Sequence, residues 1–234
     1  MSGILYLVGT GPGDPELLTL KAVRILGTAA VIAFPQKAGE PSLSYRIAES
    51  HLNPKAQLLP ADIPMATERG PAQAAYDGVA IEIMTHLNAG QDVAYLCEGD
   101  PLFYGSAMYL LTRIAGQAEV RVIPGITSLT ATAAAIGRPL AARNEVLKVL
   151  PAPLEDAILR AELTGAEAVA IIKVGRHFDR IRVLLEETGH AEAAMVIEHA
   201  SSDQQRITPL RDFAADTRPY FSTILCYKGR EAWA

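Results

Sequence analysis

The sequence predicts an α/β fold, and three observations support this prediction. Short apolar runs of strand character alternate with helical patterns along almost all of the 234 residues. Three of these apolar runs are followed by a turn that contains glycine and then by a helical pattern. Half of the residues are hydrophobic, which is enough for a substantial buried core. Because open α/β sheets bind ligands at the carboxyl ends of their strands, the three turns are candidate binding elements.

The first strand–turn–helix unit stands at the start of the chain. Residues 4–8 are an apolar run typical of a buried strand, and residues 9–13 contain three glycines. Glycine permits a positive φ and a close approach of a ligand to the backbone. Asp14 is a good N-cap and Pro15 a good first helical residue, so we expect a helix over residues 17–26.

The glycine spacing differs from that of a dinucleotide-binding fingerprint, which is G-x-G-x-x-G. The glycines here are Gly9, Gly11 and Gly13, with Pro12 between the last two. The acidic residue expected about 20 residues later is missing, since residues 33–35 are Ala-Phe-Pro. This turn by itself is therefore equally consistent with cofactor binding and with a plain tight turn.

The next elements complete the first predicted domain, residues 1–116. The clearest helix lies over residues 72–87, where apolar residues recur at i, i+3, i+4 and i+7, and Gly90 ends it. A buried strand follows at 92–97 and leads into the second turn, Glu98-Gly99-Asp100-Pro101. The other expected elements are strands at 30–34 and 57–59 and helices at 44–52 and 107–114.

The remaining elements form the second predicted domain, residues 117–234, with a crossing near 116–118. A strand at 120–123 runs into the third turn, Pro124-Gly125, and a small-residue helix at 127–136 follows. The strand-rich tail favours a mixed sheet, although one long doubly wound sheet would show a similar alternation. The later strands are expected at 146–150, 168–173, 194–198, 205–207 and 221–227, and the helices at 154–161, 178–185 and 210–215.

Composition argues against several classes of protein. The net charge of −5 disfavours general nucleic-acid binding, which rests on clustered Lys and Arg. No apolar run approaches the roughly 20 residues of a membrane span, and no signal-peptide pattern is present. The five histidines lack zinc-site spacing, and Cys97 and Cys226 lie in apolar strands typical of buried thiols. We therefore expect a soluble cytoplasmic protein without a metal site.

Three motifs together resemble those of the tetrapyrrole (corrin/porphyrin) methylases, which use S-adenosylmethionine. Residues 9–19 match G-x-G-P-G-D-x-x-L-L-T, residues 99–101 match the G-D-P turn, and residues 122–128 match V-x-P-G-[IV]-[TS]-S/A. The motifs stand in the family's order along nearly the whole chain. Residues 102–104, 146–152 and 219–222 further resemble the branch that methylates precorrin-2 at C20.

The resemblance implies two α/β domains with the cofactor in a cleft between them, a tetrapyrrole substrate and a homodimer. Carried over position by position, it implies cofactor contacts from Pro12, Gly99, Asp100, Phe103, Thr127, Ser128, Lys173 and Ala200. The substrate's carboxylates require local positive charge, for which the candidates are Lys37, Arg46, Arg69, Arg138, Arg143 and Arg176. The sirohaem-forming branch has a proposed base, an Asp, after its second strand, where this chain has Pro35. The catalytic base therefore stays unassigned.

Several residues have two interpretations that the sequence leaves open. Asp100 either caps the helix after Pro101 or faces the cationic end of the cofactor. Glu98 is either a turn carboxylate or an acceptor of a ring proton, and Tyr104 is either packed or in contact with substrate. Lys173 is either a ligand contact or a lysine at a strand end that reaches water.

Three other functions remain as alternatives. A related enzyme would methylate the same kind of ring at another carbon, or methylate a cobalt-loaded ring at C20. A non-catalytic tetrapyrrole carrier would use the same cleft without the methyl donor. A nicotinamide oxidoreductase is disfavoured by the glycine spacing and by the missing acidic residue.

Overall fold

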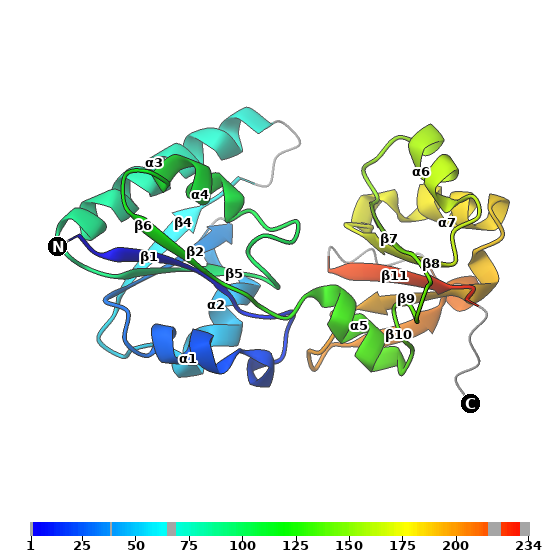
Figure 1. Ribbon diagram of the computed structural model, residues 1–234, viewed down its shortest axis with the longest axis horizontal. Helices are drawn as coiled ribbons and strands as arrows, with labels where there is room; N and C mark the ends of the chain where they lie inside the picture. Colours follow the sequence, from blue (N-terminus) through cyan, green and yellow to red (C-terminus); the bar gives the residue numbers. More distant parts are fainter. Residues whose placement is uncertain (1, 38, 65–68, 215–220, 230–234) are drawn as a thin grey trace. The chain divides into compact units, whose positions relative to one another are not determined.

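The chain forms two compact units, Met1–Thr127 and Ser128–Ala234. The computed structural model describes residues 2–37, 39–64, 69–214 and 221–229. Each unit contains one sheet with helices on its faces, so the predicted α/β class is confirmed (Figure 1). The sequence places the crossing near residues 116–118, whereas the units divide after Thr127. The reason is that strand β6 (Glu119–Ile123) pairs with β1 (Ile4–Gly9) and so completes the first sheet.

Among the described residues, the first unit has a six-stranded sheet in the order β3-β2-β5-β1-β6, with β4 also paired to β2. The strands β1, β2, β4, β5 and β6 are all parallel to their partners in this group, and only β3 is antiparallel. Their carboxyl ends therefore share one edge of the sheet, which we call the first carboxyl edge. The further bounds are β2 Val31–Lys37, β3 Glu40–Pro41, β4 Gln57–Asp62 and β5 Val93–Cys97.

Helices cover both faces of the first sheet. Helices α3 (Arg69–Asn88) and α4 (Met108–Ile114) pack on one face, and α1 (Leu20–Leu26) and α2 (Leu43–Ala48) pack on the other (Figure 1). The predicted face of α3 is confirmed, because its buried residues are Tyr76, Val79, Ala80, Ile83 and Leu87. Strand β5 is buried along its whole length, as expected for a central strand with helices on both sides.

The first helix differs from the prediction. Asp14 is an N-cap as expected and accepts a hydrogen bond from the Glu16 amide at 2.8 Å, but it begins only a short 3-10 turn, Pro15–Leu17. Helix α1 begins later because the hydroxyl of Thr19 accepts a hydrogen bond from the Ala22 amide at 3.2 Å. Two caps close together thus divide one predicted helix into two.

The second unit has a five-stranded mixed sheet in the order β10-β9-β11-β8-β7. Strands β8 and β9 both run antiparallel to β11, and β7 runs parallel to β8. The carboxyl ends of β7, β8 and β9 therefore share one edge, which we call the second carboxyl edge. The bounds are β7 Leu147–Pro151, β8 Ala168–Ile172, β9 Ala194–Glu198, β10 Arg206–Pro209 and β11 Ser222–Tyr227.

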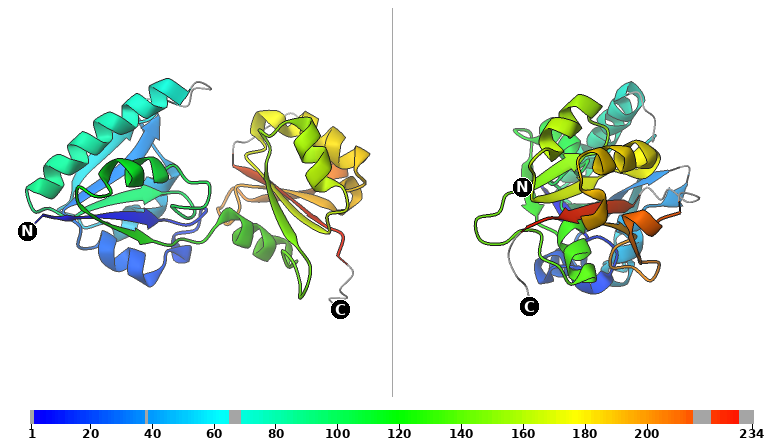
Figure 2. Two further views of the ribbon diagram at one scale, coloured as in Figure 1. Left: turned by 45° about the horizontal axis from the view of Figure 1, so that its top comes forward. Right: turned by 90° about the vertical axis from the view of Figure 1, so that its right-hand side faces the viewer.

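Helices α6 (Asp156–Leu163) and α7 (Phe178–Glu187) cover one face of the second sheet, and α5 (Ser128–Ile136) lies on the other (Figure 2). The described part of the chain also contains short 3-10 turns at Glu49–His51, Gly175–His177, Ala191–Ala193 and Leu210–Asp212. The expected helix at 210–215 is reduced to the last of these turns, and Ala215 lies outside the described residues.

Arg113 connects α4 to α3. Its guanidinium donates hydrogen bonds to Asp77 Oδ1 at 2.7 Å, to Gln73 Oε1 at 2.8 Å and to the carbonyl of Tyr109 at 2.9 Å. We expect Arg113→Met to lower the free energy of unfolding by about 1–3 kcal/mol. The substitution removes hydrogen bonds that are donated by a charged guanidinium whose side chain is only 20% exposed. Urea denaturation measures this change.

Arg121 provides the matched control. It forms an ion pair with Glu119 at 2.7 Å, but the two side chains are 51% and 55% exposed. Exposed pairs contribute less than about 1 kcal/mol, so Arg121→Met should change stability little. Equal losses in the two variants would contradict the role assigned to Arg113.

Candidate functional site

The first and second turns meet at the first carboxyl edge. They follow β1 and β5, which are neighbours in the sheet. The Thr10 amide donates to the Cys97 carbonyl at 2.8 Å, and the Gly99 amide donates to the Gly11 carbonyl at 2.8 Å. The Gly11 amide completes the pair by donating to the Gly99 carbonyl at 3.3 Å. Two turns far apart in sequence are thus held together by backbone hydrogen bonds.

The third turn, after β6, joins them through close backbone contacts. A Cβ atom on Gly125 would lie 2.1 Å from the Gly99 carbonyl oxygen and 2.8 Å from Gly9 Cα. A Cβ atom on Gly9 would lie 2.6 Å from the Gly125 amide nitrogen. No side chain fits at these two positions, and Gly99 has a φ of 65° that also favours glycine. We call Gly9, Gly99 and Gly125 the glycine cluster.

The carboxylate of Asp100 fixes the second turn against the third. Its Oδ2 accepts a hydrogen bond from the Gly125 amide at 3.0 Å, and its Oδ1 accepts one from the Leu102 amide at 2.9 Å. The second of these bonds closes a local turn and caps no helix, so the expected capping role is wrong: residues 101–107 form turns, and α4 begins only at Met108. The first links residues 25 positions apart and was not expected. Asp100 therefore holds the geometry of the glycine cluster whatever else it contacts.

The remaining predicted cofactor residues of this unit lie in the same three turns. Pro12 follows Gly11, and Thr127 follows Ile126, whose carbonyl oxygen would lie 3.8 Å from a Cβ on Gly99. The Phe103 amide donates to the Asp100 carbonyl at 3.3 Å, and its ring meets that of Tyr104 edge-on, with 5.1 Å between centroids. The first carboxyl edge thus gathers Pro12, Gly99, Asp100, Phe103 and Thr127.

In the second unit, Lys173 follows β8 and Ala200 follows β9, so both lie at the second carboxyl edge. The backbone here is strained: φ is 58° at Lys173, 48° at His199 and 66° at Ser201. Left-handed residues other than glycine cost of order 1–3 kcal/mol each and cluster at functional sites. The sequence did not indicate these conformations at His199 and Ser201, because neither residue type requires a positive φ.

Helix α5 places Ser128 toward this same edge. The far end of the helix, Ile136, lies beside Tyr227 at the end of β11, and β11 starts at the second carboxyl edge. Within α5, the Thr132 hydroxyl donates a hydrogen bond to the Ser128 carbonyl at 2.5 Å. The second carboxyl edge is therefore the part of the second unit where we place Ser128, Lys173 and Ala200.

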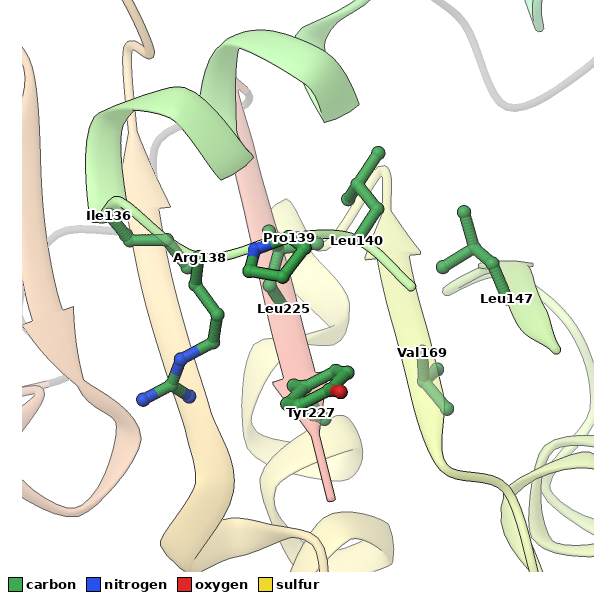
Figure 3. Close-up of a pocket in the computed structure, with 9 residues that line it drawn as sticks. Ile136, Arg138, Pro139, Leu140, Leu147, Val169, Leu225 and Tyr227 are labelled. Atoms are coloured by element: carbon green, nitrogen blue, oxygen red, sulfur yellow. The ribbon is translucent and has the colours of Figure 1, made fainter. Parts of the chain in front are cut away.

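A small apolar pocket lies at the opposite edge of the second sheet, near the amino ends of β7 and β8 (Figure 3). Its cavity volume is about 10 Å³, far below the roughly 300–1,000 Å³ of sites that bury a drug-sized ligand. Arg138, a candidate for substrate carboxylates, lines this pocket and so lies far along the sheet from Lys173. The lining residues are Ile136, Arg138, Pro139, Leu140, Leu147, Val169, Leu225, Cys226 and Tyr227.

The two cysteines are free and buried, as predicted. Burial raises the pKa of the Cys226 thiol to about 12, and it raises the pKa of Cys97 as well. The thiolate is the reactive form, so burial of the two thiols suppresses their reactivity. We expect no alkylation of the native protein by iodoacetamide at pH 8 and modification of both cysteines in urea, measured by mass spectrometry. Rapid labelling of the native protein would contradict this burial.

Other kinds of site have no support in the described part of the chain. No group of three or more His, Cys, Asp or Glu side chains lies close enough to hold a metal ion. Across the same ranges, no helix is both long and apolar enough to cross a bilayer. Pro219, Tyr220 and the side chain of Arg69, which the sequence singles out, lie outside the described residues.

The sequence matches that of known proteins over almost its full length. The family model for Tetrapyrrole (Corrin/Porphyrin) Methylases matches residues 4–214. A precorrin-2 C(20)-methyltransferase from Sinorhizobium is 41% identical, with 96% of this chain and 97% of that protein covered. A cobalt-precorrin-2 C(20)-methyltransferase from Salmonella typhimurium is 31% identical over 97% of this chain and 98% of that protein. The chain also spans about half (46%) of the cobalamin biosynthesis protein CobIJ of Mycobacterium bovis, at 39% identity.

Solved structures agree with this assignment. A uroporphyrin-III C-methyltransferase from Thermus thermophilus, complexed with S-adenosylhomocysteine, is 25% identical with a TM-score of 0.71, covering 97% of this chain and 98% of that one. A cobalt precorrin-4 methyltransferase is 20% identical and shows the same fold, with a TM-score of 0.75 over 96% of this chain and 94% of that one. The family model, the relatives and the three convergent turns all indicate the same family. The chain belongs to the tetrapyrrole (corrin/porphyrin) methylases.

Proposed function

We propose that this methylase transfers a methyl group from S-adenosylmethionine to C20 of precorrin-2, giving precorrin-3A. The observation that carries the proposal is the glycine cluster, where three turns that bear the family's motifs meet through close backbone contacts. Glycine at these positions lets the three turns approach closely, which brings their motif residues to one edge of the sheet, where open α/β sheets bind ligands. The near-full-length similarity to precorrin-2 C(20)-methyltransferase supports the choice of substrate and ring position.

The cofactor-binding residues of this proposal are those gathered at the two carboxyl edges: Pro12, Gly99, Asp100, Phe103, Thr127, Ser128, Lys173 and Ala200. When bound, S-adenosylmethionine supplies a methyl group that is already activated on a sulfonium. The residues of the chain then have to bind the cofactor and the tetrapyrrole, orient them and exclude water. Positioning of this kind can lower the activation free energy by about 7–11 kcal/mol. This division of roles fits turns built from glycine, proline and small polar residues, and no general base is assigned.

The same proposal includes a homodimer that acts in the cytoplasm. The dimer rests on the family resemblance, and sedimentation velocity of the purified protein measures it. A reducing compartment suits a chain whose two cysteines are free and buried.

The proposal is tested by incubating purified protein with S-adenosylmethionine and precorrin-2, either metal-free or cobalt-loaded, and locating the added methyl by NMR. One methyl at C20 is the expected result, and a methyl on another carbon would overturn the assignment. Calorimetry with S-adenosylhomocysteine and with NAD distinguishes the other functions. A carrier would bind tetrapyrrole and ignore the methyl donor, and an oxidoreductase would bind NAD instead.

A further inference from the structure

The chain after the second turn exposes large apolar side chains close to the glycine cluster. Leu102, Tyr104 and Met108 stand in this stretch, and all three are exposed, with 41% of the Tyr104 surface accessible. We call residues 102–108 the apolar segment; it leads from β5 into α4 (Figure 1). Single exposed apolar residues are common on proteins, but a group of them marks a surface that another molecule covers.

The base of the apolar segment is fixed to the glycine cluster through Asp100. The Asp100 carboxylate accepts the Leu102 amide at 2.9 Å, and its carbonyl accepts the Phe103 amide at 3.3 Å. A Cβ atom on Gly105 would lie 2.9 Å from the same carbonyl oxygen, so the chain returns to Asp100 after three residues. Since Asp100 also accepts the Gly125 amide at 3.0 Å, residues 102–104 form a loop whose base belongs to the glycine cluster.

The backbone of Tyr104 is strained. Its φ is 55°, and among the described residues of the first unit it alone combines a positive φ with a side chain. A bulky residue in this region is an outlier that persists only where the surrounding structure holds it. Glycine would adopt the same φ at no steric cost. A tyrosine at a position whose backbone favours glycine therefore points to a use for the aromatic side chain.

Phe103 holds the Tyr104 ring from one side. The two rings meet edge-on, with 5.1 Å between their centroids and 87° between their planes. This geometry is favourable for an aromatic pair, and it restricts how the Tyr104 ring can turn. Because Phe103 is half-buried and Tyr104 is exposed, the pair keeps an aromatic surface accessible in a preferred orientation.

We propose that Tyr104 places its ring against a face of the tetrapyrrole and thereby positions the substrate beside the methyl donor. A tetrapyrrole is a broad ring of linked pyrroles, with apolar faces and with its carboxylates around the rim. An accessible aromatic ring complements such a face, and Leu102 and Met108 add apolar surface in the same segment. The inference rests on the proposed function, because it takes the tetrapyrrole as the substrate of this site. Of the two roles that the sequence leaves open for Tyr104, we assign contact with the substrate.

The test is steady-state kinetics with each substrate varied in turn. Tyr104→Ala should raise the KM for the tetrapyrrole about tenfold and change the KM for S-adenosylmethionine less than about threefold. Tyr104→Phe keeps the ring, so both of its KM values should stay within about twofold of the wild type. An unchanged tetrapyrrole KM in Tyr104→Ala would overturn the proposal, and so would a tenfold rise in Tyr104→Phe, because the hydroxyl would then be the contact.

Ile81→Ala is the matched control. Ile81 is more exposed than Tyr104, at 69%, but it lies on α3, outside the turns of the site. Its truncation removes a comparable apolar surface and should change neither KM. A rise in the tetrapyrrole KM of Ile81→Ala equal to that of Tyr104→Ala would overturn the assignment to the apolar segment.

Tyr104→Gly tests the strain without a need for turnover. Both Tyr104→Gly and Tyr104→Ala lose the ring, but only glycine relieves the positive φ. The glycine variant should therefore melt about 2–4 °C above the alanine variant, while both show the raised tetrapyrrole KM. Equal melting temperatures would overturn the choice of Tyr104, and the glycine variant still gives the KM if the alanine variant does not fold.

A second copy of the chain is the other molecule that could cover the apolar segment. In that case Tyr104→Ala would lower the sedimentation coefficient and leave both KM values unchanged, which would overturn the proposal. Absorbance titration of the tetrapyrrole without a methyl donor should show the affinity of Tyr104→Ala reduced by about tenfold. A wild-type enzyme that neither binds nor methylates a tetrapyrrole would instead refute the proposed function.

Discussion

Replacing Gly125 with alanine is expected to weaken the binding of S-adenosylhomocysteine strongly. The new Cβ would lie 2.1 Å from the Gly99 carbonyl oxygen and 2.8 Å from Gly9 Cα, and both contacts are to backbone that cannot rotate away. The three turns must separate to admit it, which should lower the free energy of unfolding by about 1–3 kcal/mol or more. Isothermal titration calorimetry should show an affinity loss greater than about tenfold, equivalent to about 1.4 kcal/mol.

Gly78→Ala is the control for this substitution. Gly78 lies on the exposed face of α3, and no atom outside its own helical turns lies within 4 Å of the position that a Cβ would take there. Alanine in a helix interior is favoured over glycine by roughly 0.5–1 kcal/mol, so this variant should be slightly more stable and bind normally. If Gly125→Ala bound S-adenosylhomocysteine as the wild type does, the glycine cluster would not be the cofactor site.

Replacing Asp100 with alanine is expected to have the second-largest effect. The change leaves the part-buried Gly125 amide without its acceptor, which costs up to about 1–3 kcal/mol, whereas the exposed Leu102 amide can bond water instead. Because the Gly125 bond joins two turns of the cluster, S-adenosylhomocysteine affinity should fall by about tenfold or more. Asp100→Asn keeps one acceptor oxygen and should give an intermediate result in the same titration.

Asp92→Ala is the control for the Asp100 substitution. It removes one carboxylate–amide hydrogen bond at the far edge of the same sheet, so it should lower the melting temperature without lowering affinity. A loss of stability in Asp100→Ala with unchanged affinity would show that Asp100 supports the turn alone.

Much of the fold could be read from the sequence because it depends on local patterns. The apolar rhythm of residues 72–87 reports one buried face, and that face is the one that packs on the sheet. Asp14 and the glycine-bearing turns were identifiable because capping and positive φ depend on residue type. Boundaries were less certain where two signals compete, as at Thr19, whose hydroxyl begins a second helix shortly after the first cap.

The candidate site shows the limit of this approach. The sequence indicates three turns of similar character, and the family resemblance assigns residues to them. The hydrogen bond between Asp100 and Gly125 joins segments distant in sequence, and no local pattern predicts such a contact. The sequence also did not predict the left-handed conformations of Lys173, His199 and Ser201, because their residue types do not require them.

The sequence by itself therefore determined the order and type of most elements, the turns that follow them and the family to which the chain belongs. Only the tertiary structure decided which turns meet. The physical reason is that hydrophobic periodicity records whether a segment is buried, whereas the order β5-β1-β6 depends on pairing between strands far apart in the chain. That pairing brings Gly9, Gly99 and Gly125 together, and it leaves no room for a side chain at Gly9 or at Gly125.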